Sequence, residues 1–311
     1  MINSIKYNIA IDFRYVENVN SGLSRFSINI FQNLLNLNDD EDINYFILLP
    51  PKSLVKDSEI LWEFNSSNVI KIYSKRKRGL KWKIPFFLID ISLYQKLRNA
   101  NIDFFISPYI DPPLLPGIKV ISTIHDLIFL RVNNYFNYFR LFKRIISEFR
   151  ILLTIISSYH LLSVSYTSKN ILINRYKYLP FLKQKLNDIT VIYNGVTKFE
   201  SKDLNYNYKK ICSKKDFFLY VGDRRNHKNL FYTIELIKKY NDFYKKDYEL
   251  IIAGSNNYKN KKLTNYIFSN SFVKEIINPN DELLDYLYRE CMSLILLAID
   301  EGFGIPVIEA A

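Results

Sequence analysis

The sequence is poor in the residues from which disulfide frameworks and metal sites are built. It holds two cysteines, Cys212 and Cys291, and three histidines in 311 residues. Two cysteines cannot make a disulfide framework, and neither lies in a metal-type spacing, so cysteine usage favours a reducing compartment. Because His125, His160 and His227 are far apart in sequence, we expect no metal site built on imidazole.

Long apolar runs are also missing. The longest, residues 151–156, is far shorter than the roughly 20 residues that a membrane-spanning helix needs. The first residues have no basic patch ahead of an apolar stretch, so they do not indicate a secretory signal. We therefore expect a cytoplasmic protein that is not integral to a membrane.

Acidic residues are outnumbered. There are 43 Lys and Arg against 31 Asp and Glu, and the formal charge of +12 attracts polyanions. An AT-rich coding bias would raise lysine without any binding role, so charge alone does not choose a partner. No basic motif interleaved with aromatic residues favours nucleic acid. Peripheral contact with the anionic inner face of a membrane stays open.

Short β-branched and aromatic runs alternate with stretches of helix length, which predicts βα units, parallel sheets and an α/β fold. The expected helices of the first part are 23–37, 86–98 and 139–156. The expected strands there are 6–11, 43–49, 103–107, 119–124, 160–164 and 189–192. A second series has strands expected at 217–222, 248–254, 271–277 and 293–298, and Asp281 as the N-cap of a helix through Cys291.

A polar, lysine-rich stretch at residues 199–216 has no clear periodicity, which is typical of a linker or surface loop. We therefore expect two domains, 1–200 and 201–311. Two α/β domains that face one another form a cleft at the carboxyl ends of their strands, where open parallel sheets bind ligands. The functional residues should lie in the loops that follow the strands.

Glycine is scarce, so its positions are informative. Turn geometry alone would account for any one of them, because glycine allows tight turns and close approaches. Together, those that follow expected strands favour a phosphate-binding cleft built from backbone amides. These are six of the eight glycines: Gly22, Gly195, Gly222, Gly254, Gly302 and Gly304.

The most specific pattern is LLAIDEGFGIPVIEA, at the end of the sequence. Glu301 is followed by Gly302, Phe303 and Gly304, and a second carboxylate, Glu309, comes after seven intervening residues. The proline between them suits the first turn of a helix, so that amides of the preceding loop can point at a diphosphate. This arrangement resembles that of the nucleotide-sugar glycosyltransferases of family 4 (glycosyl transferases group 1), which have two Rossmann-like domains in the GT-B fold.

The resemblance runs from about residue 9 to the last residue and implies roles for this motif. Glu301 would lie near the transferred sugar, and Glu309 would accept hydrogen bonds from the ribose hydroxyls of the nucleotide. The backbone amides of Gly302, Phe303 and Gly304 would stabilise the leaving diphosphate. Ala298 and Asp300 depart from the residues usual in the family.

A basic loop, LYVGDRRNHKNL, follows an expected strand of the second domain. Gly222 and Lys228 have the spacing at which the family carries a loop glycine and a phosphate-binding lysine. Many relatives have arginine directly after the glycine, where this chain has Asp223, so Arg224 or Arg225 would supply the second cation. Cations at such a turn suit a pyrophosphate that gains charge as its bond to the sugar breaks. A solvated basic loop is the alternative.

His125 and Asp126 end the apolar run VISTIHDLIFL in the first domain, as His-Asp does in the family. A carboxylate can orient an imidazole, and the resemblance implies that His125 touches the transferred sugar, with Asp126 in the cleft. Residues 11–31 resemble the family's opening. Gly22 would then line the diphosphate and Arg25 would lie beside the cleft, although a salt bridge between the domains accounts equally for Arg25.

The resemblance implies a metal-independent, retaining glycosyltransferase without a cofactor. It would move a hexose-type sugar, mannosyl or glucosyl, from a nucleoside diphosphate sugar to a glycan or lipid-linked acceptor in surface polysaccharide biosynthesis. Two alternatives stay open: a nucleotide-sugar epimerase or hydrolase on the same fold, and a non-catalytic nucleotide-binding partner subunit. Family members continue past Ala311 with further strands and a terminal helix, so we expect the second domain to be incomplete.

Overall fold

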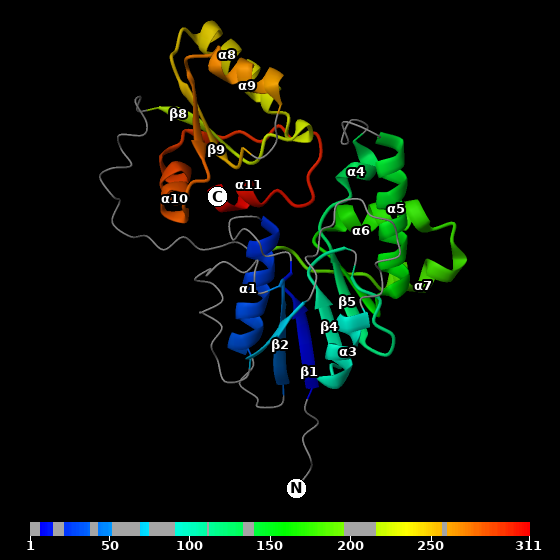
Figure 1. Cartoon of the computed structure of the whole chain (residues 1–311). Coiled ribbons are helices and arrows are strands. Elements are labelled where there is room, and N and C mark those ends of the chain that lie inside the picture. The colour runs from blue at the N-terminus through cyan, green and yellow to red at the C-terminus, as the bar shows by residue number, and fades with distance from the viewer. Residues whose placement is uncertain are drawn as a thin grey trace. The chain divides into compact units, whose positions relative to one another are not determined.

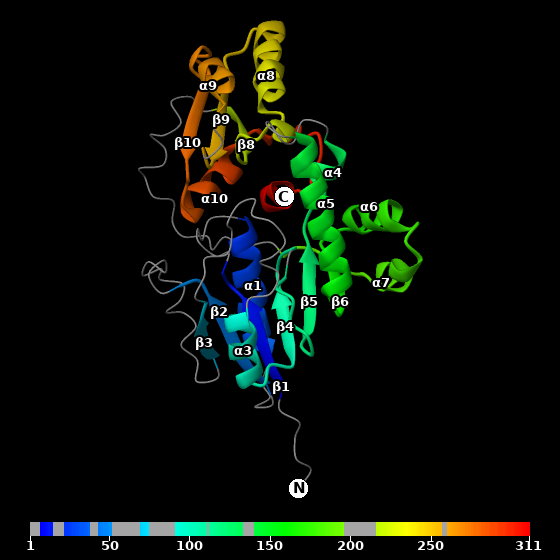
Figure 2. The same ribbon diagram turned by 45° about the vertical axis from the view of Figure 1, so that its right-hand side comes forward.

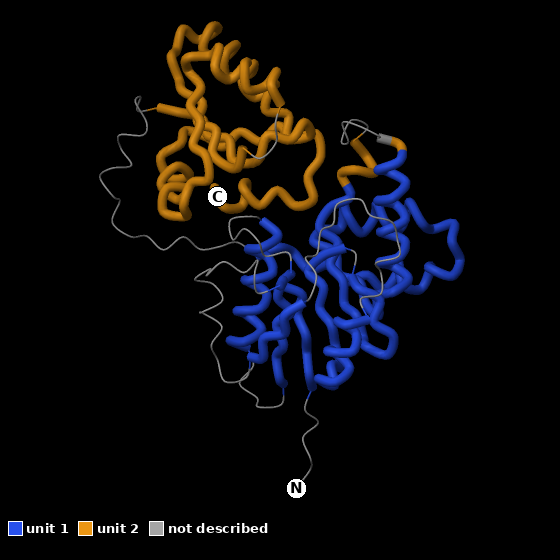
Figure 3. The backbone as a smooth tube through the Cα atoms, viewed as in Figure 1, with its two compact units in different colours: residues 1–127, 142–195 blue, residues 128–141, 196–311 orange. Residues whose placement is uncertain are grey.

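The computed structural model describes residues 7–14, 22–37, 43–51, 69–74, 91–110, 112–132, 140–195, 216–256 and 260–311. The chain divides into two compact units (Figure 3). The first unit comprises Met1–Leu127 and Phe142–Gly195, and the second comprises Ile128–Leu141 and Val196–Ala311. The division after Gly195 lies close to the expected domain boundary, whereas the expected boundaries placed all of Ile128–Leu141 in the first domain.

Within the described residues, the first unit holds a seven-stranded parallel sheet in the order β3-β2-β1-β4-β5-β6-β7 (Figure 1). In the centre of the sheet, Ile9 lies opposite Tyr45 on one side and Phe104 on the other. The strands are β1 (Tyr7–Asp12), β2 (Ile43–Leu49), β3 (Val69–Tyr73), β4 (Phe104–Ser107), β5 (Lys119–Ile124), β6 (His160–Ser163) and β7 (Thr190–Val191).

Helices cover both faces of this sheet. Successive residues of a strand point to opposite faces, and β2 shows the consequence: Ile47 packs with Phe31 of α1, whereas Leu48 packs with Leu93 of α3. Figure 2 shows α5 running along the side of the unit that carries β6. The helices are α1 (Gly22–Leu37), α3 (Ile91–Asn99), α5 (Arg140–Ser157), α6 (Tyr166–Tyr176) and α7 (Lys183–Asn187), and α4 (Ile128–Arg131) lies in the segment assigned to the second unit.

The second unit repeats this architecture on a smaller scale. Its described strands form a parallel sheet in the order β10-β9-β8-β11. On β8, Phe218 packs towards α8 and α9, and Leu219 packs towards α10. The strands are β8 (Phe217–Val221), β9 (Glu249–Gly254), β10 (Val273–Ile277) and β11 (Ser293–Leu294). The helices are α8 (Leu230–Tyr244), α9 (Lys261–Phe268), α10 (Asp281–Glu290) and α11 (Ile305–Ala310).

The expectation of an α/β fold with two parallel sheets is confirmed, and some element boundaries differ. The edge strand β3 was not predicted, since it is only partly buried and lacks a clear alternation. Asn280, not Asp281, is the N-cap of α10, because its side-chain oxygen accepts a 3.0 Å hydrogen bond from the amide of Leu283. Residues 86–90 of the expected helix and 199–215 of the expected linker lie outside the described residues.

The strand expected at 293–298 is also shorter in the structure. It ends at Leu294, and the chain continues from Ile295 as a loop that reaches α11. Among the described residues, no helix is both long enough and apolar enough to cross a membrane.

Candidate functional site

Two loops of the second unit meet at the carboxyl end of its sheet. One follows β8 and contains a 3-10 turn, Asn226–Lys228, and the other runs from β11 to α11. The backbone joins them, since the amide of Ile299 donates a 2.7 Å hydrogen bond to the carbonyl of His227. This bond places the basic loop beside the segment that carries Glu301.

Lys228 and Glu301, two residues predicted to belong to the site, form an ion pair across these loops. They are 73 positions apart in sequence, and their side chains are 13 % and 22 % exposed. Partial burial strengthens the attraction between the ammonium and the carboxylate relative to an ion pair in water. The structure therefore brings a phosphate-type cation and a candidate catalytic carboxylate to one place.

Arg224 supports the loop instead of facing solvent. Its side chain is 2 % exposed and pairs with Glu275 of β10, Nη2 to Oε1, at 3.0 Å. Its Nη1 atom donates to the carbonyls of Gly222 and Ser255 at 3.2 and 3.1 Å. One guanidinium thus connects the carboxyl ends of β8 and β9 with the middle of β10. The expected role of Arg224 as a phosphate ligand finds no support in this geometry.

Arg225 is the more accessible of the two arginines. Its side chain is 42 % exposed, and its Nε donates to Asp223 at 2.6 Å. The backbone amide of Arg225 donates to the other carboxylate oxygen of Asp223 at 3.1 Å. Asp223, which stands where many relatives have arginine, therefore orients the arginine two positions later.

One glycine of this edge, Gly254, is explained by the packing of the backbone. A Cβ atom at Gly254 would collide with the carbonyl oxygen of Gly222, and φ at Gly254 is +137°. Side chains rarely adopt that conformation. The approach of β8 to β9 therefore requires glycine at position 254 whether or not a ligand binds there.

The motif around Gly304 forms a turn that enters a short helix. Gly304 is in the left-handed conformation, with φ of +79°, and α11 begins at the next residue with Pro306 in its first turn, as predicted. Glu309 lies on α11, and its carboxylate accepts a 2.8 Å hydrogen bond from the hydroxyl of Tyr288 on α10. Gly302 and Phe303 lie half-buried in the loop between Glu301 and Gly304.

In the first unit, His125 follows β5, with its ring against the edge of Phe26 from α1 at a centroid distance of 4.4 Å. Its Nε2 lies 2.8 Å from the carbonyl oxygen of Pro108. Burial lowers the pKa of His125 from 6.5 to about 4, although the hydrogen bond to Pro108 opposes the shift. The imidazole is therefore neutral near pH 7. Because a carbonyl only accepts, Nε2 carries the proton and Nδ1 is left as an acceptor.

Three further residues of the first unit were predicted to belong to the site. Asp126 is the next residue and is half-buried. Gly22 is the exposed first residue of α1, and an added Cβ there would meet no atom within 4 Å. Arg25 is half-buried and precedes Phe26, the residue that contacts the histidine.

Three contacting residues were not predicted from the sequence: Glu275, Tyr288 and Phe26. Glu275 had a signal, because a carboxylate inside the strand-like run SFVKEII needs a partner when it is covered. No sequence signal marked Tyr288 or Phe26, since aromatic residues at those helical positions also suit an ordinary core.

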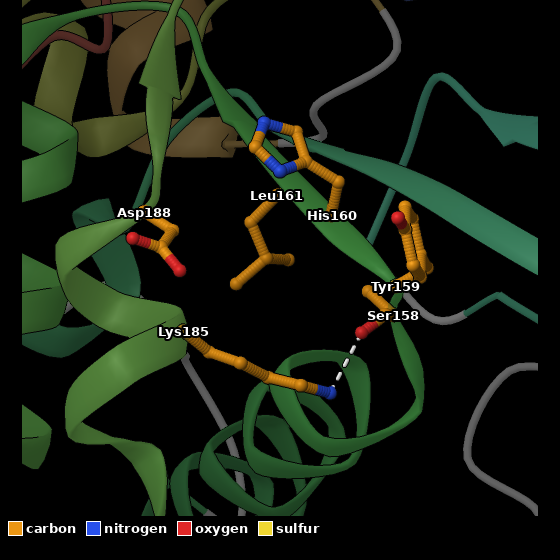
Figure 4. A pocket seen from close by; sticks show the side chains of 6 residues that line it. All are labelled: Ser158, Tyr159, His160, Leu161, Lys185 and Asp188. Carbon is orange, nitrogen blue, oxygen red and sulfur yellow. Dashed lines mark hydrogen bonds between the residues drawn. The ribbon is translucent and has the colours of Figure 1, made fainter.

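A small pocket of the first unit is lined by Ser158, Tyr159, His160, Leu161, Lys185 and Asp188 (Figure 4). Lys185 donates to the carbonyls of Ile155, Ile156 and Ser158 at 3.1, 2.6 and 2.7 Å. Its three protons are thereby used at the carboxyl end of α5. The lysine anchors that helix and leaves the pocket without a free ammonium donor.

Comparison with known proteins adds independent information. Residues 202–311 match the family model of Glycosyl transferases group 1. An O-antigen chain mannosyltransferase of Salmonella typhimurium is 26 % identical over 250 residues, which are 78 % of this chain and 63 % of that protein. The chain thus spans less than two thirds of the length of that relative.

Solved structures show that the fold is of the GT-B type. A glycosyltransferase from Rickettsia africae is similar over 98 % of this chain and 76 % of its own, with a TM-score of 0.65 and 18 % identity. A UDP-GlcNAc 2-epimerase from Methanocaldococcus jannaschii is similar over 93 % of this chain and 78 % of its own, with a TM-score of 0.51 and 16 % identity. The fold is therefore shared by enzymes of different reactions.

Proposed function

We propose that this chain is a glycosyltransferase of family 4 that binds a nucleoside diphosphate sugar at the carboxyl edge of its second sheet. The observation that carries the proposal is the Lys228–Glu301 pair, which joins two loops within the segment matched by the glycosyltransferase family. A diphosphate needs cations and amide donors in a protected place. Lys228, Arg225 and the turn at Gly302–Gly304 offer them.

Donor binding would proceed by an exchange of partners. In the structure, the ammonium of Lys228 is paired with the carboxylate of Glu301. A diphosphate carries more negative charge than one carboxylate, so it competes for the lysine and repels Glu301. The released carboxylate would then lie next to the diphosphate, where the transferred sugar begins. Glu301 is thereby available to a sugar hydroxyl while Lys228 stabilises the leaving group.

The neutral His125 suits contact with a sugar. Its Nδ1 atom accepts a hydrogen bond, and an uncharged ring does not attract the diphosphate away from Lys228. We propose that His125 receives a hydroxyl of the transferred sugar. Glu309, which already accepts a hydrogen bond from Tyr288, would receive the ribose hydroxyls with its remaining acceptor capacity.

The substrates are proposed from the relatives. The similarity to an O-antigen chain mannosyltransferase favours a hexosyl donor and a glycan or lipid-linked acceptor in surface polysaccharide biosynthesis. We propose retention of configuration, and no cofactor or essential metal, because Lys228 and Arg225 supply positive charge where a metal would otherwise act. Epimerisation is the second candidate, since an epimerase has a similar fold.

A product analysis separates these reactions. A panel of UDP-, GDP- and ADP-linked hexoses is incubated with the chain in EDTA, with and without lipid-linked oligosaccharide from a polysaccharide-producing bacterium. A transferase releases nucleoside diphosphate mainly in the presence of acceptor and yields a longer glycan. An isomerised donor sugar would show epimerase activity instead. Release of nucleoside diphosphate at the same rate with and without acceptor would show hydrolase activity.

A further inference from the structure

Three neighbouring strands of the first unit end at the same level of its sheet. The last residues of β5, β6 and β7 lie opposite one another in the strand register. His125, Tyr166 and Tyr193 follow these three strands in turn. Ligands of open parallel sheets bind at the carboxyl edge, where all three residues lie. His125 has a part in the proposed function, and neither tyrosine has one.

Hydrogen bonds attach the start of α6 to His125. The side chain of Ser165, the N-cap of α6, accepts a 3.1 Å hydrogen bond from the amide of Ser168. The hydroxyl of Ser168 donates to the carbonyl oxygen of His125 at 3.4 Å. The first turn of α6, which begins at Tyr166, is therefore held beside the backbone of His125.

Tyr166 and Tyr193 form an exposed aromatic pair that we call the tyrosine ledge. Their ring centroids are 6.3 Å apart, and the angle between the ring planes is 64°. Tyr166 is 60 % exposed and Tyr193 is 58 % exposed. Edge-to-face packing is a favoured arrangement of two aromatic rings, and here it orients them without burying them. The ledge therefore presents aromatic surface at the edge where ligands bind.

The surroundings of the ledge favour an uncharged ligand. Lys169, which is one turn along α6 from Tyr166, donates to the carbonyl of Ile189 at 2.6 Å. His125 is neutral near pH 7, because burial lowers its pKa to about 4. A sugar ring carries C–H groups that match the negative face of an aromatic ring, and its hydroxyls match the tyrosine O–H. A neutral sugar therefore complements the ledge.

We propose that the tyrosine ledge binds the terminal sugar of the acceptor and selects an uncharged one. This inference rests on the proposed function, in which His125 receives a hydroxyl of the transferred sugar. An acceptor sugar on the ledge lies at the same edge of the sheet as His125, and transfer requires the two sugars to meet. A phosphorylated terminal sugar is disfavoured, because its charge loses hydration on the rings. Tyr166 and Tyr193 thus determine specificity and take no part in proton transfer.

The test measures saccharide binding in the absence of a donor, by ligand-observed NMR with the full chain. The neutral probes are the methyl glycosides of mannose, glucose, galactose and N-acetylglucosamine. Mannose 6-phosphate is the charged probe, because the start of a helix attracts an anion. Tyr166→Ala and Tyr193→Ala each remove one ring of the ledge, whereas Tyr166→Phe keeps the ring face. Tyr178→Ala is the matched control, since it removes a tyrosine of the first unit that is 79 % exposed.

We expect the wild type and the control to bind the same neutral glycoside equally and to bind mannose 6-phosphate more weakly. Each alanine variant should bind the glycoside about five- to tenfold more weakly, since one ring face is lost. Tyr166→Phe should stay within about twofold of the wild type, because the ring remains. Circular dichroism establishes that each variant is folded.

Titration with UDP, GDP and ADP separates this inference from the proposed function. Nucleotide affinity should be the same in the wild type and in all variants. A wild type that binds a glycoside but no nucleotide would contradict the proposed function alone. The role of the ledge would be overturned by a wild type that binds no neutral glycoside, by equal glycoside binding in the wild type and both alanine variants, or by tighter binding of mannose 6-phosphate.

Discussion

The strand ends after β5 and after β8 carry opposite kinds of chemistry. After β5, His125 is neutral at pH 7, because burial lowers the pKa of its ring to about 4. After β8, the loop brings together Asp223, Arg224, Arg225 and Lys228, each in an ion pair. The first is suited to a hydroxyl and the second to a phosphate. The proposed function assigns a sugar hydroxyl to the first strand end and the diphosphate to the second.

The first prediction concerns Arg224, the buried side chain that holds the charged loop in place. Arg224→Ala leaves Glu275 without its buried partner and frees two carbonyl groups. Loss of one partner of a buried pair costs about 3 to 5 kcal/mol, and we expect that loss in the free energy of unfolding of the second unit, measured in urea.

Arg225→Ala is the matched control, since it removes the neighbouring guanidinium, whose side chain is 42 % exposed. An exposed ion pair contributes about 0 to 1 kcal/mol. Equal destabilisation by the two substitutions would contradict the different positions assigned to these arginines.

Arg224 and Arg225 also show which part of the candidate site could not be predicted from the sequence. Residue type and spacing predict the charged loop and the Glu301 motif as a candidate site. The choice between Arg224 and Arg225 could not be predicted, because adjacent residues have the same charge and differ only in which of them meets Glu275 of another strand. That meeting depends on the order β10-β9-β8 in the sheet, which local spacing does not contain.

The fold, too, could be predicted in part. Short apolar runs that alternate with stretches of helix length predicted both parallel sheets, since a strand buried on both faces is apolar along its whole length. The edge strand β3 was missed because it is half solvated. Asn280 and Asp281 are equally good N-caps by residue type, so only the backbone conformation distinguishes them. The strand that ends just before His125 was predicted from the sequence, whereas the hydrogen bond between His125 and Pro108, seventeen residues away, was not.

A second prediction concerns the dependence of stability on pH. The pKa of His125 is lowered from 6.5 to about 4 by burial. The pKa of His227, in the second unit, is also lowered to about 4, first by burial and then by Arg225 and Lys228. The unfolded chain therefore binds protons more readily than the folded chain. Stability is fully present above pH 6.5 and is lost as the pH falls towards 4.

For each histidine the loss is at most about 1.4 kcal/mol per pH unit in this window. His125→Asn should remove the contribution of the first unit and make its urea unfolding less sensitive to pH between 6.5 and 4. His160→Asn, at the half-buried start of β6, serves as the control. An unchanged slope in His125→Asn would show that burial does not hold this ring neutral.

The prediction with the smallest effect tests the proposed role of Glu309 as an acceptor for the ribose hydroxyls. Glu309→Gln should weaken binding of a nucleoside diphosphate by about two- to tenfold, as expected for one hydrogen bond. Tyr288→Phe removes the other partner of Glu309 and should leave the affinity nearly unchanged. Isothermal titration gives both dissociation constants, and a larger effect of the tyrosine would assign Glu309 to packing of α11 on α10.

The most direct test of the account is a titration of UDP, GDP and ADP into the wild type, Lys228→Ala and Glu301→Gln at one fixed salt concentration. If Lys228 exchanges Glu301 for the diphosphate, the two substitutions shift affinity in opposite directions. Lys228→Ala should weaken the preferred nucleotide by about ten- to a hundredfold, the worth of a charge-assisted hydrogen bond. Glu301→Gln should tighten it, because the competing carboxylate is gone. An unchanged dissociation constant in Lys228→Ala, or a weaker one in Glu301→Gln, would contradict the exchange.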